Sequence, residues 1–218
     1  MISPDLVPLL GQALEETAYM VAVSAALAAV GGLLIGVLLV LTDRGGLLPA
    51  RPVNALLGLV VNIGRSLPFI ILLVAIIPFT RAVVGTTIGT TAAIVPLTVS
   101  AIPFYARIAE TAIREVDRDV IAAARAMGAS RWQIIFKVLL REARPGLVAG
   151  LTITIVALVG YSAMAGVVGG GGLGDLALRY GYQRFEDDIM IATVVLLVIF
   201  VQVIQMLGDL IVRRLSHR

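Results

Sequence analysis

The stretch that decides the fold runs from Arg114 to Gly146 and reads REVDRDVIAAARAMGASRWQIIFKVLLREARPG. It holds seven of the 17 basic residues of the chain, and long apolar segments flank it. Its alanines favour a helix, and Gly128 can take the left-handed conformation that ends one. Ser130 precedes Gln133 by three residues, the spacing of a capping box that starts a second helix. The pattern predicts two helices joined at a glycine, and we call residues 114–144 the elbow.

The rest of the chain is too apolar for a water-soluble domain. Of its 218 residues, 59% are hydrophobic and 14% are charged, and the mean hydropathy is +1.02. A helix of about 20 apolar residues crosses the hydrocarbon core of a bilayer. We therefore expect an all-α integral membrane protein with one transmembrane domain, residues 1–218. Its five spans are expected at about 18–41, 55–79, 90–112, 145–168 and 189–212.

The distribution of basic residues predicts the orientation of these spans. With the N-terminus outside, the inner segments hold two arginines in the first loop, seven basic residues in the elbow and three in the tail. The outer segments hold only three, Arg81, Arg179 and Arg184. Cytoplasmic segments are enriched in arginine and lysine, so we expect an outside N-terminus, an inside C-terminus and a cytoplasmic elbow. Residues 1–16 lack the basic region of a secretory signal, so the first span is expected to be retained.

The sequence offers little material for catalysis. Lys137 is the only lysine and follows no glycine-rich phosphate loop, so this chain is not expected to hydrolyse ATP. Cysteine is absent, and the single histidine, His217, is expected to add only charge to the tail. No carboxylate pair lies deep in a span, which weakens a gradient-driven carrier. Nothing resembles a basic, aromatic-rich surface for nucleic acid. We expect no enzymatic activity, metal or cofactor in this chain.

Glycines mark two other regions. Gly32 and Gly36 form a GxxxG pair in the first span, a pattern of close helix contact. Gly169, Gly171 and Gly174 formally match a dinucleotide-binding fingerprint, but a membrane helix precedes them where that fingerprint requires a strand. We expect a flexible external loop there.

Polar residues and prolines interrupt the second and third spans. Arg65 lies close to the bilayer, where an arginine faces water, protein or headgroups; a pathway role and simple snorkelling both remain open. Pro68 is expected to kink or restart the helix. Arg107 and Glu110 are three residues apart at the end of the third span, a spacing that allows an ion pair.

The elbow resembles the EAA loop of binding-protein-dependent ABC importer permeases. The similarity rests on Ala122, Ala123 and Ala124, on Arg125, Met127 and Gly128, and on Val138, Leu140 and Pro145. Two positions depart from the family motif: Ala122 replaces the usual glutamate and Arg141 the usual proline. The resemblance implies that residues 122–128 form a coupling helix that seats in a groove of a separate ATPase subunit.

Further stretches resemble the permeases of methionine importers. They are 62–70 (NIGRSLPFI), 77–81 (IPFTR) with 85–86, 160–166 (GYSAMAG), 170–177 (GGGLGDLA) and 179–185 (RYGYQRF). The resemblance implies a homodimer in the bacterial inner membrane with two cytoplasmic ATPases, which bind the ATP and magnesium, and an external substrate-binding lipoprotein. The substrate would be methionine, with its D form open as a further substrate. Tyr161 and Met164 are candidates for lining the pathway, because aromatic rings and thioethers offer polarizable contacts. Arg65 is a further candidate, because of its position close to the bilayer. Ordinary helix packing is the alternative for Tyr161 and Met164.

Three rival functions remain for this sequence. An importer of another amino acid would share every feature above. A gradient-driven carrier would need coupling carboxylates within its spans. A scaffold without transport would leave the order of residues in the elbow unexplained. Five spans also suit half of a symmetric dimer, with ten spans and a pathway on the two-fold axis.

Overall fold

The computed structural model describes residues 6–216, which excludes His217 and its predicted role. Within these residues the chain is helical and has no strand, which confirms the all-α prediction. The helices are α1 (Leu6–Thr42), α2 (Arg51–Ser66), α3 (Phe69–Ala75), α4 (Ile77–Val84), α5 (Thr90–Arg114), α6 (Arg118–Ala126), α7 (Arg131–Gln133), α8 (Leu140–Glu142), α9 (Arg144–Ala165), α10 (Gly172–Leu176) and α11 (Asp187–Ser216). Three π-helical segments join some of them: η1 (Ile134–Leu139), η2 (Gly166–Gly170) and η3 (Ala177–Tyr182).

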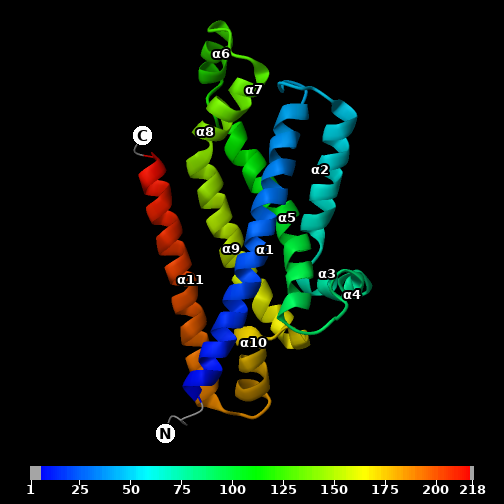
Figure 1. Cartoon of the computed structure of the whole chain (residues 1–218), viewed down its shortest axis with the longest axis vertical. Coiled ribbons are helices and arrows are strands. Elements are labelled where there is room, and N and C mark those ends of the chain that lie inside the picture. The colour runs from blue at the N-terminus through cyan, green and yellow to red at the C-terminus, as the bar shows by residue number, and fades with distance from the viewer. Residues whose placement is uncertain (1–5, 217–218) are drawn as a thin grey trace.

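Four long helices form an elongated bundle (Figure 1). They are α1, α5, α9 (continued by η2) and α11, and each is long and apolar enough to cross a membrane. The elbow projects from one end of the bundle, beyond the C-terminal end of α11, and α10 lies at the other end. We call the two ends the elbow end and the opposite end.

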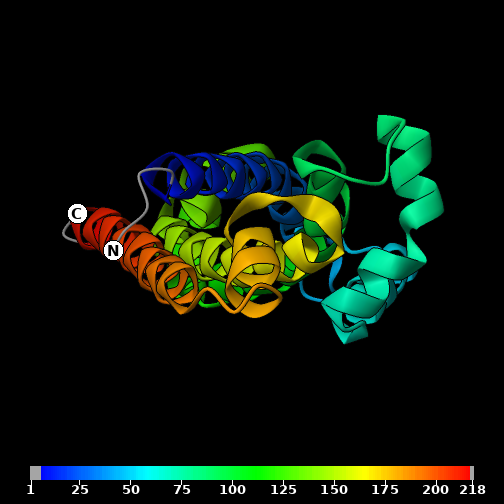
Figure 2. The same ribbon diagram turned by 90° about the horizontal axis from the view of Figure 1, so that it is seen from below.

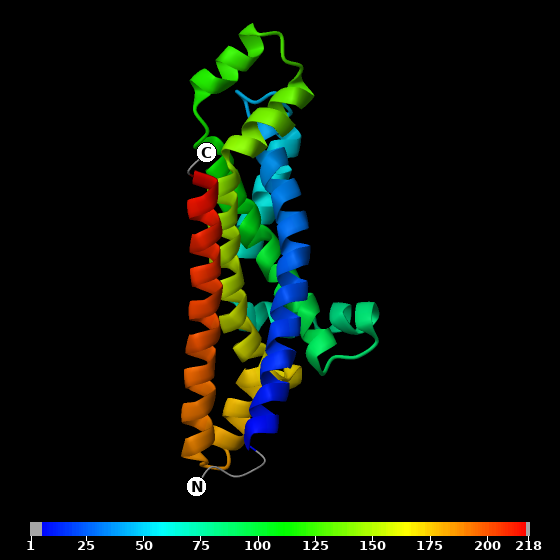
Figure 3. The same cartoon turned by 60° about the vertical axis from the view of Figure 1, so that its left-hand side comes forward.

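The predicted span at 55–79 is bent rather than straight. Helices α2 and α3 meet at an angle of 104° across Leu67 and Pro68, so they form a fifth crossing only if the bent pair is counted as one span. Leu67 is extended, with φ −86° and ψ 125°, as steric conflict with a following proline requires. Helices α3 and α4 then project sideways from the bundle (Figures 2 and 3). Pro68 restarts the helix in a new direction.

Close contact between α1 and α5 forms the centre of the bundle. A Cβ added at Gly32 would lie 2.9 Å from the Ile102 carbonyl oxygen, and one added at Gly36 would lie 2.7 Å from that of Ala106. Both distances are shorter than a Cβ can tolerate, so the two backbones approach this closely only because both positions are glycine. The GxxxG prediction of close helix contact is confirmed.

The glycine-rich segment after α9 is folded, which corrects the expectation of a flexible loop. Gly169, Gly171 and Gly172 have φ values of +87°, +78° and +76°, and they reverse the chain sharply between η2 and α10. The Gly172 N–H donates to the Glu16 carboxylate at 2.7 Å. The Leu173 N–H donates to the Thr17 hydroxyl at 2.9 Å. Leu173 is fully buried, so apolar packing and two hydrogen bonds hold α10 against α1.

The packing of α1 on α5 leads to a stability prediction. Gly36→Leu is expected to lower the thermal unfolding midpoint of the detergent-purified protein, because overpacking against backbone costs about 1–3 kcal/mol. Gly11→Leu in the same helix is the control, because nothing lies within 4 Å of a Cβ added there. Equal midpoints for the two variants would contradict the assigned α1–α5 contact.

Candidate functional site

The elbow has the local structure that its sequence predicts. Helix α6 begins after Asp117, whose carboxylate accepts the Asp119 N–H at 2.9 Å. It ends before Gly128, which has a φ of +79° and turns the chain. The Gln133 N–H then donates to Ser130 Oγ at 3.3 Å, and the Ser130 N–H donates to Gln133 Oε1 at 2.8 Å. The predicted capping box and left-handed glycine are both confirmed.

A single apolar cluster joins the elbow to the ends of the long helices. We call the parts of the elbow before and after Gly128 its first arm and its second arm. Ile134, Ile135 and Leu139 of the second arm are buried with Leu41 of α1 and Tyr105 of α5. The Tyr105 hydroxyl also donates to the Leu147 carbonyl oxygen of α9 at 3.1 Å. This continuous cluster packs the elbow against the ends of α1, α5 and α9.

Five of the six candidate coupling residues are exposed, and one is buried. Ala124 is buried in the cluster, with 4% of its surface exposed. Ala122 and Arg125 line a cavity between α6 and the loop that joins α1 to α2. The other three exposed residues do not line it, and they are Ala123, Met127 and Gly128. The alanine run therefore serves partly to pack the first arm on the second.

The elbow exposes three large apolar side chains. Met127 is 82% exposed, Trp132 63% and Phe136 61%. The rings of Trp132 and Phe136 stack with their centroids 6.1 Å apart. Exposed aromatic and methionine side chains are typical of protein interfaces. The sequence reasoning missed Trp132 and Phe136, although two aromatic residues four apart in an otherwise basic stretch were a usable signal.

Four charged residues form a continuous chain of ion pairs where the elbow meets the bundle. Glu110 binds Arg107 at 2.8 Å and Arg114 at 2.9 Å, and Arg114 also binds Asp43 at 2.7 Å. The Glu110 side chain is 6% exposed. The hydrogen bond from Arg114, with that from the Arg44 N–H, lowers the pKa of Asp43. The predicted Arg107–Glu110 pair is confirmed, and the Asp43–Arg114 pair extends it from α5 to the end of α1.

The candidate pathway residues lie along α2 and α9. Arg65 is exposed in the last turn of α2 and has no ion-pair partner among the described residues. It lies 14 residues from the start of α2, which places it about 21 Å along the helix from the elbow end.

Tyr161 is half-buried and stacks on Phe69, with ring centroids 4.8 Å apart and an interplanar angle of 9°. Phe69 is the first residue of α3, so this pair joins α9 to the bend of the predicted second span. Met164 is 48% exposed one turn further along α9. The structure thus pairs Tyr161 with a residue that the sequence reasoning did not select, and no described contact joins Tyr161 to Arg65.

The family model for binding-protein-dependent transport system inner membrane components matches residues 32–218. The chain belongs to this family and is an inner-membrane component.

Relatives within the family are close. A probable D-methionine transport system permease protein, MetI, of Vibrio cholerae is 57% identical over 203 residues, 93% of this chain and 90% of the relative. The methionine import system permease protein MetP of Bacillus subtilis is 46% identical over 181 residues, 83% of this chain and 82% of the relative.

Solved structures share the fold. A chain from inward-facing conformations of the MetNI methionine ABC transporter superposes with a TM-score of 0.95 and 51% identity, covering 99% of both chains. A chain from an amino acid ABC transporter crystallised with histidines superposes with a TM-score of 0.79 over 95% of this chain and 94% of that one. Its 20% identity shows a shared fold alone.

The chain of ion pairs leads to a second stability prediction. Glu110→Gln is expected to lower the unfolding free energy by about 1–2 kcal/mol, because two arginines lose their carboxylate; the exposure of both arginines limits the loss. Asp43→Asn is the matched control and is expected to cost less, because the Asp43 side chain is 36% exposed. Thermal midpoints in detergent measure both. A larger loss for Asp43→Asn would contradict the central position of Glu110.

Proposed function

We propose that this chain is the membrane-spanning permease subunit of an ATP-driven ABC importer that carries methionine across the inner membrane, with D-methionine as a further substrate. The observation that carries the proposal is the 57% identity to a probable D-methionine permease over 93% of this chain. The folded elbow supports the proposal, because a transport chain without a phosphate loop of its own needs a surface that binds a separate ATPase subunit. The nucleotide and magnesium belong to the partner ATPase.

The working unit is a homodimer with an outside N-terminus and a cytoplasmic elbow. The apolar side chains that α2 exposes, Leu56, Leu59, Val60 and Ile63, face lipid or a second copy. Asn62, Arg65 and Ser66 are also exposed, near the end of the same helix. A charge at this depth is costly against lipid, so this end of α2 faces a water-filled pathway between two copies.

Coupling runs through the elbow. The surface that meets the ATPase consists of Ala123, Met127, Gly128 and Trp132, and Ala122 and Arg125 flank this surface. Ala124 packs the first arm of the elbow on the second. Movement of the two ATPases displaces both elbows, and the apolar cluster beneath carries that displacement into α1, α5 and α9. An external binding lipoprotein delivers methionine at the opposite end.

The pathway lies beside the bend at Pro68. Tyr161 and Met164 lie three residues apart on α9 and so share one face of that helix. Their aromatic ring and thioether give polarizable contacts for the side chain of methionine. Arg65 lines the same passage and offers its guanidinium to the carboxylate of the substrate.

Uptake of labelled methionine into proteoliposomes tests the function. The vesicles contain this chain and its ATPase, with the binding protein outside, ATP inside or absent, and ion gradients dissipated. Uptake that requires internal ATP and is competed by unlabelled methionine is the expected result. ATP-dependent uptake of a different amino acid would overturn the substrate, and uptake that follows an ion gradient without ATP would overturn the importer.

A pair of substitutions at Gly128 tests coupling. Gly128→Trp is expected to reduce uptake about tenfold or more while the dimer stays assembled, because a bulky residue strains the left-handed turn and blocks the docking surface. Gly128→Asn is the control, because asparagine tolerates this conformation with little bulk. Size-exclusion chromatography confirms assembly. Normal uptake with Gly128→Trp would contradict the coupling role.

A further inference from the structure

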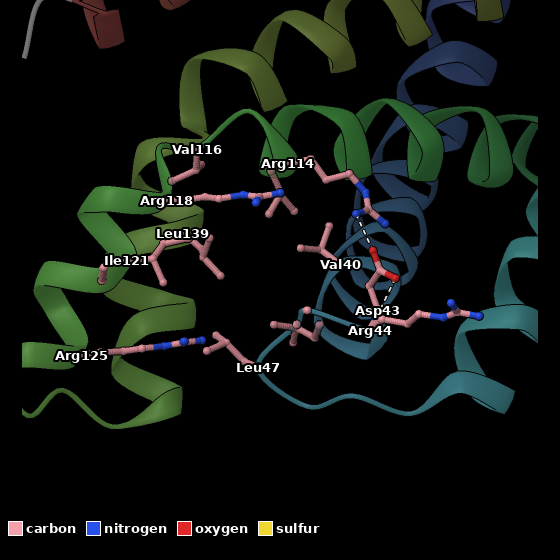
Figure 4. Close-up of a pocket in the computed structure, with 15 residues that line it drawn as sticks. Val40, Asp43, Arg44, Leu47, Arg114, Val116, Arg118, Ile121, Arg125 and Leu139 are labelled. Carbon is pink, nitrogen blue, oxygen red and sulfur yellow. Dashed lines mark hydrogen bonds and ion pairs between the residues drawn. The ribbon is translucent and has the colours of Figure 1, made fainter.

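A cavity of about 470 Å³ lies between α6 and the loop that joins α1 to α2. Its walls come from the end of α1 and its loop, the end of α5, α6 and η1, and Figure 4 shows the lining side chains. None of the exposed outer residues Met127, Trp132 and Phe136 lines it. Ala122 and Arg125 do line it, so the cavity lies beside the proposed ATPase-docking surface.

The charge of the cavity is strongly positive. Four arginines line it against one carboxylate, Asp43, which is already bound to Arg114. Arg118 and Arg125 are seven residues apart on one face of α6, and both side chains extend from that helix toward the α1 side (Figure 4). Neither has an ion-pair partner among residues 6–216. Both guanidinium groups therefore line the cavity without an acidic partner in this range.

The remaining walls are apolar. Ile121 and Leu139 lie on the α6 side and Val40 and Leu47 on the α1 side, with Ile113 and Val116 between them. Guanidinium groups form bidentate hydrogen bonds with phosphate, and an apolar wall beside them favours a ligand that also carries hydrocarbon. A small hydrated anion has no hydrocarbon that could pack against these apolar walls.

The level of the cavity fits the boundary of the bilayer. The apolar sequence of α1 ends at Thr42, immediately before Asp43, and α5 ends at Arg114. Both positions border the cavity, where the two long helices leave the hydrocarbon. Basic pockets at this level bind the headgroups of anionic lipids.

We propose that this cavity binds the phosphate headgroup of an anionic phospholipid from the leaflet on the elbow side, with Arg118 and Arg125 as its ligands. The bound lipid bridges α6 and the α1–α2 loop and steadies the elbow against the bundle. The proposal rests on the proposed membrane placement of the elbow end, and it is independent of the transported substrate. It predicts that coupling depends on anionic lipid.

Native mass spectrometry of the full-length protein, alone and in complex with its ATPase, tests the site with added phosphatidylglycerol or phosphatidylcholine. The wild-type protein is expected to retain phosphatidylglycerol in preference. Arg118→Gln combined with Arg125→Gln is expected to weaken that binding about tenfold or more. The control combines Arg131→Gln with Arg141→Gln, two exposed elbow arginines outside the cavity, and is expected to bind as the wild type does. Circular dichroism confirms folding of both double variants.

Each other outcome overturns the proposal. Equal binding of phosphatidylglycerol by the two double variants would mean that elbow charge acts without a site. Displacement of the lipid by millimolar inorganic phosphate would make free phosphate the ligand. Unchanged lipid binding with loss of the ATPase from the Arg118 and Arg125 variant would assign both arginines to carboxylates of that subunit. Because lipid binding is measured without transport, an error in the proposed substrate would leave these results unchanged.

Discussion

The approach of α1 to α5 at Gly32 and Gly36 is the contact on which the rest of the structure depends. Both backbones come so close that a single added Cβ would meet the Ile102 or Ala106 carbonyl oxygen within 3 Å. Lipid supplies no hydrophobic force that brings helices together, so such contacts rely on dispersion between closely fitted surfaces. With these two helices fixed, α9 packs against both, and the elbow has a rigid base.

Charge then determines how that base meets the elbow. Arg107, Glu110, Arg114 and Asp43 form one chain at the point where the long helices end, and the buried Glu110 lies at its centre. Beyond them, basic residues that lack acidic partners are available to ligands or partners. The long apolar helices carry few charges away from their ends, and Arg65 in the last turn of α2 is exposed without an ion-pair partner among the described residues. The positions of charge thus separate the parts that hold the fold from those that act.

Local chemistry explains which features the sequence predicted. A capping box, a left-handed glycine and an i, i+3 ion pair involve neighbours in the chain, so Ser130, Gln133, Gly128, Arg107 and Glu110 were readable from spacing. Contacts between distant segments were not. The Asp43–Arg114 pair spans 71 residues, and the Phe69–Tyr161 stack depends on the direction that the chain takes after Pro68. The glycines near α10 suggested a flexible loop, because the residues that bind this segment, Glu16 and Thr17, lie 156 residues away in the sequence. The linear motif that suggested the six candidate coupling residues could not show that Ala124 is buried while the other five are exposed.

The central claim of the proposed function is that the ATPases displace the elbow and that the apolar cluster beneath it carries this displacement into α1, α5 and α9. The sequence contains no cysteine, so an Ala123→Cys or a Tyr182→Cys variant carries one spin label in each copy of the dimer. Ala123 reports on the elbow, and Tyr182, which is 67% exposed, reports on the opposite end. The measurement is the distance between copies by pulsed electron paramagnetic resonance, without nucleotide and with ATP trapped. The elbow labels are predicted to approach each other while the opposite labels separate. Approach of the elbow labels with no change at the opposite end would contradict the claim.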